Sequence, residues 1–268
     1  MKWPKLIILM ILGVFGYGIL YGIGGAILLK GSDLVFLNIL SSLLYTFALL
    51  FIYRRCRIAY EDSVHEEINK GDIIKGAIVG FFLAVLIWTL FYCIMLLFHL
   101  AAVEYNTINL SQLSKGLCFC LFVAVGEEII CRGTIFRLLD LKTNFYVASI
   151  ISSIAFGFLH LPNVGANALS CICVALGSGL ILSLLTKYYN SILPAIAFHW
   201  IWNFIEGYIG GNLVSGEQFE NSLFQTEYVC NDLLSGGDFG PEQSVIIVVF
   251  GFALSLTLCF KLYRKLSD

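Results

Sequence analysis

Long apolar stretches follow one another along almost the whole chain, with short polar segments between them. A helix that crosses a membrane needs about 20 predominantly apolar residues. Eight stretches meet or approach that length: 6–29, 33–53, 73–100, 111–132, 145–161, 165–186, 192–210 and 244–260. The pattern predicts an all-α fold, a polytopic transmembrane bundle of about eight membrane helices that forms a single membrane domain over residues 1–268.

Composition supports this class and excludes others. Of the 268 residues, 59% are apolar and only 13% are charged, which is more apolar than a water-soluble domain. The net charge of −2, without a basic patch interleaved with aromatic residues, argues against a nucleic-acid partner. The nine cysteines form no CxxC metal motif, so we expect them to be small apolar fillers in contact with lipid or protein.

The distribution of Lys and Arg predicts the orientation, because these residues concentrate in cytoplasmic loops. Apart from Arg132, two cations, Lys30 and Lys115, fall on one side, and thirteen fall on the side of both termini: Lys2, Lys5, Arg54, Arg55, Arg57, Lys70, Lys75, Arg137, Lys142, Lys187, Lys261, Arg264 and Lys265. We therefore expect an integral protein of the cell membrane with cytoplasmic N- and C-termini. Residues 211–243, which contain six acids and no Lys or Arg, are predicted to be an exported acidic loop and a flexible, solvated connector.

Three ionisable residues interrupt the fourth apolar stretch, where each charge at the bilayer centre costs roughly 2.5–3.5 kcal/mol. Residues four apart share a helix face, so Glu128 and Arg132 are predicted to pair. The adjacent Glu127 points elsewhere, free to face a cavity and to act as a general base. An alternative is that both acids join a buried charge network, or bind an ion in a transporter.

Two of the four histidines also lie in apolar stretches. His160 follows Phe156 by four positions, and Asn203 follows His199 by four. An imidazole can act as an acid, as a donor to an oxyanion or as a metal ligand, and an Asn amide can donate to developing negative charge. Glu206 shares the face of His199 and Asn203 and is a candidate outer member of the site.

The depths of the two histidines conflict in a simple picture of straight spans. His199 is some 10 Å from the cytoplasmic start of its helix, whereas His160 is near the exported end of its own. They can meet if the fourth helix extends to about Leu139 and the fifth is tilted or ends in a re-entrant turn at Leu161–Pro162. From this arrangement we expect access to the site from the cytoplasm.

The motifs EExxxR (127–132), FxxxH (156–160) and HxxxN (199–203) together resemble the CAAX protease and bacteriocin-processing family (CPBP, or Abi) of intramembrane endopeptidases. The similarity covers roughly residues 115–210, the expected catalytic core. Eukaryotic members cleave near the C-terminus of prenylated proteins, and bacterial members are tied to peptide maturation, bacteriocin self-immunity and surface-protein processing. The resemblance implies a peptide or protein substrate, lipidated in some members. It also implies that Glu127 activates water, that His160 assists, and that His199 and Asn203 support the oxyanion.

The protease class and the cofactor stay open at this point. No Ser or Cys is placed as a nucleophile, which favours direct attack by water. A metallo-type enzyme could use Glu127, His160 and His199 as zinc ligands with Glu128 as the base, although the HExxH pattern of metalloproteases is absent. The rival hypothesis is a non-catalytic immunity protein, which the intact set of motif residues disfavours, or an ion-coupled transporter, against which we see no inverted repeat in the sequence.

Overall fold

Helices make up most of the computed structural model, which describes residues 3–28, 34–60, 70–107, 110–219 and 221–267. Lys2 and Lys30 of the charge count lie outside these residues. The elements in chain order are α1 (Trp3–Leu28), α2 (Val35–Tyr60), α3 (Lys70–Leu97), β1 (Ala101–Tyr105), α4 (Leu110–Glu128), π-helix η1 (Ile129–Phe136), α5 (Arg137–Asp140), α6 (Phe145–Leu159), α7 (Ala168–Val174), π-helix η2 (Ala175–Gly179), α8 (Leu180–Tyr189), α9 (Leu193–Asn203), π-helix η3 (Phe204–Ile209), β2 (Phe224–Tyr228), α10 (Asp232–Ser235), the 3-10 turns η4 (Gly237–Phe239) and η5 (Pro241–Gln243), and α11 (Val245–Ser267).

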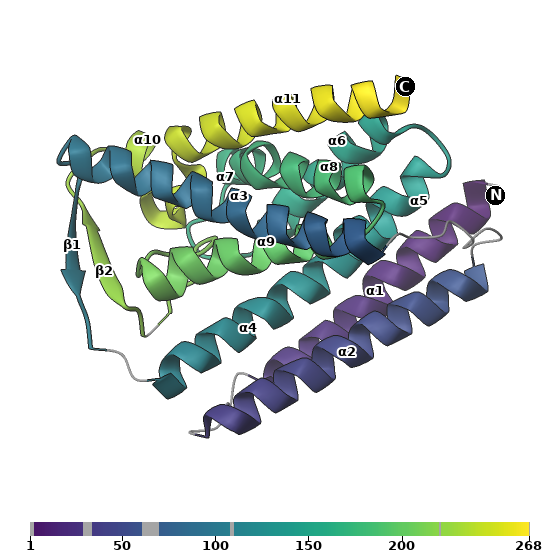
Figure 1. Cartoon of the computed structure of the whole chain (residues 1–268), viewed down its shortest axis with the longest axis horizontal. Coiled ribbons are helices and arrows are strands. Elements are labelled where there is room, and N and C mark those ends of the chain that lie inside the picture. Colours follow the sequence, from purple (N-terminus) through teal and green to yellow (C-terminus); the bar gives the residue numbers. More distant parts are fainter. Residues whose placement is uncertain (1–2, 29–33, 61–69, 108–109, 220, 268) are drawn as a thin grey trace.

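The long helices run along the long axis of the molecule, which gives the bundle two distinct ends (Figure 1). Both termini, the start of α3 and helix α5 lie at one end, called here the basic end. There Lys187 Nζ contacts Asp140 Oδ2 at 2.7 Å, and Lys265 Nζ donates to the carbonyl oxygen of Tyr188 at 2.8 Å. Strands β1 and β2 and helix α10 lie at the opposite end, called the sheet end (Figure 1).

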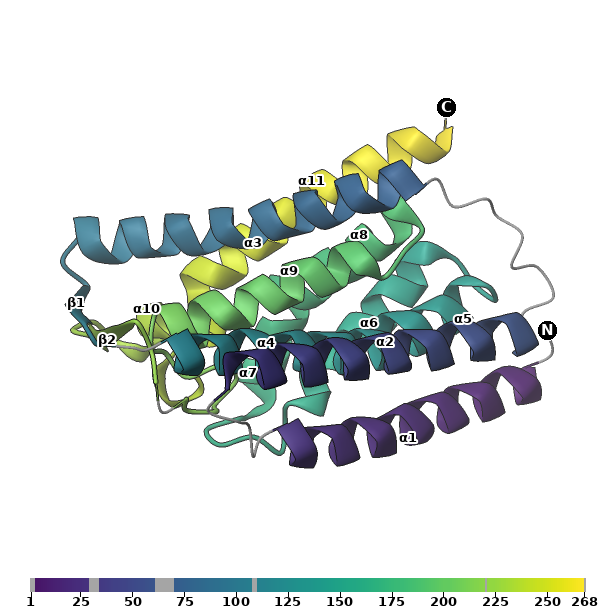
Figure 2. The ribbon, with the colours of Figure 1, turned by 60° about the horizontal axis from the view of Figure 1, so that its bottom comes forward.

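The helices stack in layers across the bundle. Figure 2 shows α3 and α11 on one face and α1 on the opposite face, with α9 between them. The indole of Trp88 on α3 packs on that of Trp202 on α9, with ring centroids 5.2 Å apart. On the other side of α9, Trp200 Nε1 donates to the carbonyl oxygen of Leu117 on α4 at 2.8 Å. Two tryptophans of α9 therefore anchor this helix between α3 and α4.

Each of the eight predicted apolar stretches contains a helix, which confirms the all-α fold. Among the described residues, four helices are long and apolar enough to cross a membrane: Val35–Arg57, Gly71–Leu97, Ala168–Tyr189 and Val245–Ser267. The other predicted spans fall short for identifiable reasons. Helix α6 has 15 residues, α9 and η3 together have 17, 11 of them in α9 and 6 in η3, and the helix through α4 and η1 carries the charges of the first motif. Helix α1 contains the apolar stretch Ile7–Leu20.

The outer surface of these helices is apolar. Phe36 and Phe47 on α2 are each 70% exposed, and Phe82 on α3 is 62% exposed. Apolar side chains in such numbers on the outside of a helical bundle are typical of contact with lipid. All nine cysteines are free thiols, of which four are buried, four are half-buried and Cys93 is exposed.

Residues 211–243 differ from the predicted flexible connector. Within them β2 pairs antiparallel with β1, from Ala101 opposite Tyr228 to Tyr105 opposite Phe224. Phe239 is buried at 1% exposure, and Glu242, expected to be solvated, is buried at 5%. The prediction of a solvated connector was wrong because the acid count hid the aromatic residues that fold this segment against the bundle.

Candidate active site

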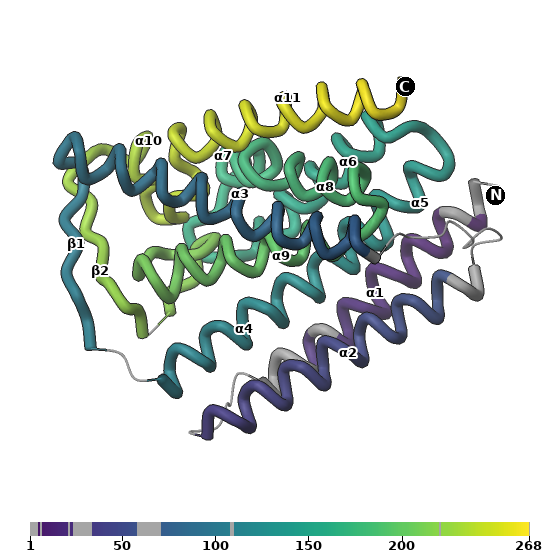
Figure 3. Tube along the Cα trace, in the orientation of Figure 1, coloured from purple at the N-terminus to yellow at the C-terminus, as the bar shows by residue number. Residues whose placement is uncertain are grey.

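The first motif lies on one continuous helical path. Helix α4 passes directly into η1 and then α5, so that the helix extends to Asp140, as expected from the depth argument (Figure 3). The change from α-helix to π-helix falls immediately after Glu128. A π-helical insertion is uncommon and often occurs at functional sites, because it turns side chains away from the positions of a regular helix.

Glu128 and Arg132 form the predicted ion pair. Arg132 Nη1 donates to Glu128 Oε1 at 2.9 Å, and neither side chain is exposed. Arg132 Nη2 donates to the carbonyl oxygen of Gly179 in η2 at 3.0 Å. Glu128 Oε1 also accepts from His199 Nδ1 at 2.9 Å. The pair therefore joins α4, η1, η2 and α9 in one buried network.

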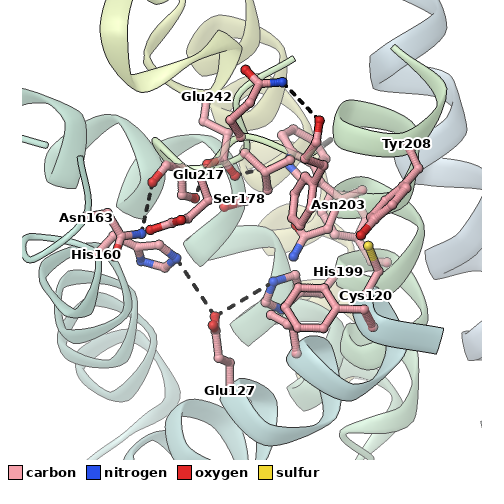
Figure 4. Close-up of a pocket in the computed structure, with 18 of the residues that line it drawn as sticks. Cys120, Glu127, His160, Asn163, Ser178, His199, Asn203, Tyr208, Glu217 and Glu242 are labelled. Carbon is pink, nitrogen blue, oxygen red and sulfur yellow. Dashed lines mark hydrogen bonds and ion pairs between the residues drawn. The ribbon is translucent and has the colours of Figure 1, made fainter. Parts of the chain in front are cut away.

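Glu127 points away from this network and between two imidazoles (Figure 4). Its Oε2 lies 3.9 Å from His160 Nε2 and 3.9 Å from His199 Nε2. The Glu127 side chain is 21% exposed, against 11% for His160 and 6% for His199. The two adjacent acids thus have separate surroundings, and the three side chains predicted to carry the chemistry meet at one point.

The other nitrogens of the two imidazoles fix their tautomers. His160 Nδ1 is 2.8 Å from the carbonyl oxygen of Phe156, which can only accept, so Nδ1 carries the proton. His199 Nδ1 faces Glu128, whose carboxylate is paired with Arg132, and it too donates. Both rings therefore present Nε2 to Glu127, either as an acceptor or, when protonated, as a donor.

Phe156 has a position that its spacing alone did not predict. Its ring contacts the Arg132 guanidinium, with Cζ 4.3 Å from the ring centroid. The same ring meets His160 edge-on at 4.9 Å and His199 at 5.5 Å between centroids. A single aromatic side chain thus packs between the buried cation and both imidazoles.

Glu127 and His160 reach the same depth from the basic end. Glu127 precedes Asp140 by 13 residues, which spans about 20 Å at 1.5 Å per residue. His160 follows the start of α6 at Phe145 by 15 residues, about 22 Å. Helix α6 ends at Leu159 and a turn reverses the chain toward α7, close to the turn predicted at Leu161–Pro162.

His199 reaches this depth because α9 starts inside the bundle. A side chain at Gly80 of α3 would collide with the carbonyl oxygen of Pro194, so the two helices touch there. Gly80 is ten residues from the start of α3 at Lys70, and His199 is five residues beyond Pro194. Together these distances place His199 about 22 Å from the basic end. The three helices therefore bring their residues to one level.

Asn203 and Glu206 follow His199 on the same helical path but have different surroundings. Asn203 is buried and lines the same cavity as Glu127 and the histidines. Glu206 lies in η3 and is wholly buried, and among the described residues neither of its carboxylate oxygens has a hydrogen-bond partner. It does not line the cavity.

The site opens into a cavity of about 1160 Å³, larger than the roughly 300–1,000 Å³ of pockets for small ligands. From Glu127 the cavity extends toward the sheet end, where Ser111, Gln112 and Lys115 of α4 line it. The lining there is completed by Val214, Ser215, Glu217, Gln218, Phe219 and Asn221. The cavity therefore leads away from the end of the bundle that holds both termini. If the termini are cytoplasmic, as expected, the cavity does not open to the cytoplasm, so the two expectations conflict.

Several cavity residues lie outside the three motifs. Glu242 accepts from Trp202 Nε1 at 3.1 Å and from the hydroxyl of Ser215. Asn163 Nδ2 donates to the carbonyl oxygen of Ser215 at 2.9 Å, which links the turn after α6 to the 211–243 segment. The one signal in the sequence is Trp202 itself, because a buried Trp N–H needs a hydrogen-bond acceptor. That signal does not identify Glu242 as the acceptor.

As they stand, the three side chains lie slightly farther apart than the ligands of a zinc ion. Zinc binds N and O atoms at about 2.0–2.2 Å in a tetrahedron, which separates ligand atoms by about 3.3–3.6 Å. Both distances from Glu127 Oε2 to the imidazoles are 3.9 Å. The described part of the chain contains no group of three His, Cys, Asp or Glu residues placed to hold a metal.

Fold and site together define a membrane-type helical bundle with a carboxylate–histidine centre. Residues 109–205 match the model of a family described as type II CAAX prenyl endopeptidase Rce1-like. The match covers a little over a third of the chain, includes all three motifs and overlaps the predicted core at 115–210. It confirms the predicted resemblance, so the chain contains an Rce1-like region. No curated protein and no solved structure gave a significant match.

Proposed function

We propose that this protein is an intramembrane endopeptidase in which Glu127 activates a water molecule for attack on a peptide bond. The observation that carries the proposal is the position of Glu127 between His160 and His199, on the floor of a large cavity, in a region that matches an endopeptidase family. Separations of 3.9 Å are too long for direct hydrogen bonds and suit bridging by one small polar group such as water.

In the proposed reaction the water oxygen attacks the carbonyl carbon of the scissile bond while Glu127 accepts its proton. Asn203 and the protonated Nε2 of His199 donate to the oxyanion, and the buried Glu128 carboxylate stabilises the imidazolium. When the C–N bond breaks, the proton passes to the departing amine, with His160 as the second proton carrier. The products are a free carboxylate and a free amine, and no covalent intermediate forms.

Glu128 and Arg132 have a positioning role in this scheme. Their ion pair is closed to solvent and fixes both the ring of His199 and the packing of Phe156. We assign the chemistry to protons and water, as in a glutamate-type hydrolase, because the separations of 3.9 Å are wider than those between the ligands of a tetrahedral zinc ion. The biological setting we propose is the processing of a peptide or protein at the membrane, in maturation or in bacteriocin self-immunity.

The test compares native protein termini in membranes that contain wild type, Glu127→Gln or Glu104→Gln at matched expression. Glu104 is exposed on β1 and does not line the cavity, so Glu104→Gln controls for loss of an acid elsewhere. We expect new termini with wild type and Glu104→Gln and none with Glu127→Gln. Identical termini in all three samples, with an immunity or transport phenotype kept in Glu127→Gln, would instead favour the non-catalytic alternative.

A further inference from the structure

The cavity extends in only one direction from Glu127. Its lining residues on α4 and η1 fall between Ser111 and Ile130, and those on α9 begin at Phe198. Helix α6 contributes only its last turn, up to His160. None of the lining residues belongs to α5 or to the turn after it, which lie at the basic end, and none belongs to the turn before α9.

The basic end of the site is closed by packed side chains. Ile129, Cys131 and Arg132, which follow Glu127 toward the basic end, each have no exposed surface. Leu185 of α8 is likewise wholly buried. At the sheet end the lining reaches the surface instead, where Glu217 and Gln218 are exposed.

The charges of the described helices assign sides to the two ends. Twelve cations of the described residues, spread over six helices and one turn, lie at the basic end: Lys5, Arg54, Arg55, Arg57, Lys70, Lys75, Arg137, Lys142, Lys187, Lys261, Arg264 and Lys265. Lys115 is the only Lys or Arg in the described parts of α4, β1, β2 and residues 211–243 that line or border the sheet end. Lys and Arg flank spans on the cytoplasmic side, so the sheet end faces away from the cytoplasm.

We infer that the active site is reached from the non-cytoplasmic face, and that its substrates are polypeptide segments exposed on that face or delivered across the membrane to it. The substrate half of this inference rests on the proposed function. The inferred access side excludes, as a substrate, a polypeptide C-terminus held in the cytoplasm, because such a segment would meet the basic end, where the site is closed. The expectation of cytoplasmic access is replaced by its opposite.

The mouth of the cavity has the chemistry to receive a peptide. Gln112 Nε2 donates to Asn221 Oδ1 at 2.9 Å, a hydrogen bond that connects α4 to the 211–243 segment across the lining. Amide side chains can exchange such a bond for bonds to a peptide main chain, which offers one donor and one acceptor per residue. An entering peptide can therefore replace the Gln112–Asn221 hydrogen bond, which spans the mouth of the cavity, at little cost in free energy.

The access side can be measured without any activity. A membrane-impermeant maleimide is applied to intact cells that express Gln218→Cys at the mouth or Lys261→Cys, which is exposed on α11 near the basic end. Burial raises the pKa of the Cys230 thiol and so slows its labelling. Both variants nevertheless carry Cys230→Ser, so that this residue adds no signal. The parent protein with Cys230→Ser gives the background from the remaining cysteines.

We expect Gln218→Cys to label in intact cells as fully as after permeabilisation, and Lys261→Cys to label only after permeabilisation. The reverse pattern would overturn the inferred access side, whatever the activity of the protein. A second arm uses a bulky maleimide and follows the new termini that wild type produces. Modified Gln218→Cys should lose cleavage relative to the unmodified variant; cleavage that persists would overturn access through this mouth. Absence of cleavage by wild type would overturn the proposed function, while the labelling pattern still decides the side.

Discussion

Replacing Arg132 by methionine tests whether one buried guanidinium holds the site together. Methionine keeps an unbranched side chain of similar reach but removes the charge and all donors. Glu128 would then be a wholly buried carboxylate whose one remaining hydrogen-bond partner among the described residues is His199. The carbonyl oxygen of Gly179 would lose its side-chain donor, and the ring of Phe156 would lose its cation.

The magnitude follows from these contacts. Breaking a buried ion pair by removing one partner costs about 3–5 kcal/mol. The lost hydrogen bond to Gly179 and the lost cation–π contact with Phe156 are worth about 1–3 and about 2 kcal/mol respectively. The three contributions overlap, since one guanidinium makes every contact. We therefore expect Arg132→Met to lower the free energy of unfolding by about 5 kcal/mol.

The measurement is reversible unfolding by SDS titration in mixed micelles, followed by tryptophan fluorescence. The matched control is the double variant Glu128→Gln, Arg132→Met, which leaves no buried charge unpaired. We expect the double variant to be more stable than Arg132→Met by about 1–3 kcal/mol. Equal stabilities of the single and double variants would refute the argument, because they would show that Glu128 is not strained by the loss of its partner.

Three further variants extend the account. Glu206→Gln should raise the free energy of unfolding by about 1–3 kcal/mol at neutral pH in the same titration, because both oxygens of this buried carboxylate lack hydrogen-bond partners in the described part of the chain; a decrease would reveal a bound cation or another partner. Phe156→Leu should fold, with an unchanged far-UV circular dichroism spectrum, but its kcat should fall about tenfold or more because the two imidazoles shift. Full activity of this variant would show that the ring does not position the imidazoles. Gln112→Ala should raise KM without lowering kcat in a steady-state assay, since it removes an amide that can bond to the main chain of the entering peptide, and a loss of kcat would contradict that role.

The charged part of the site could be predicted from helix geometry. Residues four apart on a helix share a face, and this rule alone paired Glu128 with Arg132 and turned Glu127 toward another environment. The long apolar stretches likewise predicted the helices. Both inferences depend on contacts within one element, which the sequence states directly.

The remaining features depend on contacts between elements, which the sequence does not state. The depth of His199 follows from the close approach of Gly80 to Pro194, and nothing in either local sequence predicts that contact. The π-helices that position Arg132 and Glu206 have no clear sequence signal. The 211–243 segment was misjudged because acidic composition was taken to mean solvation, whereas Glu242 is buried against Trp202.

The central claim is that Glu127 activates water, and single-turnover hydrolysis by purified protein tests it most directly. The substrate is a peptide that spans a terminus found only with wild type, and the comparison is Glu127→Gln against Glu104→Gln. We expect Glu127→Gln to lose about 10²–10⁴-fold or more in the rate of bond cleavage while still binding the peptide. Cleavage by Glu127→Gln at a rate near that of Glu104→Gln would contradict the claim.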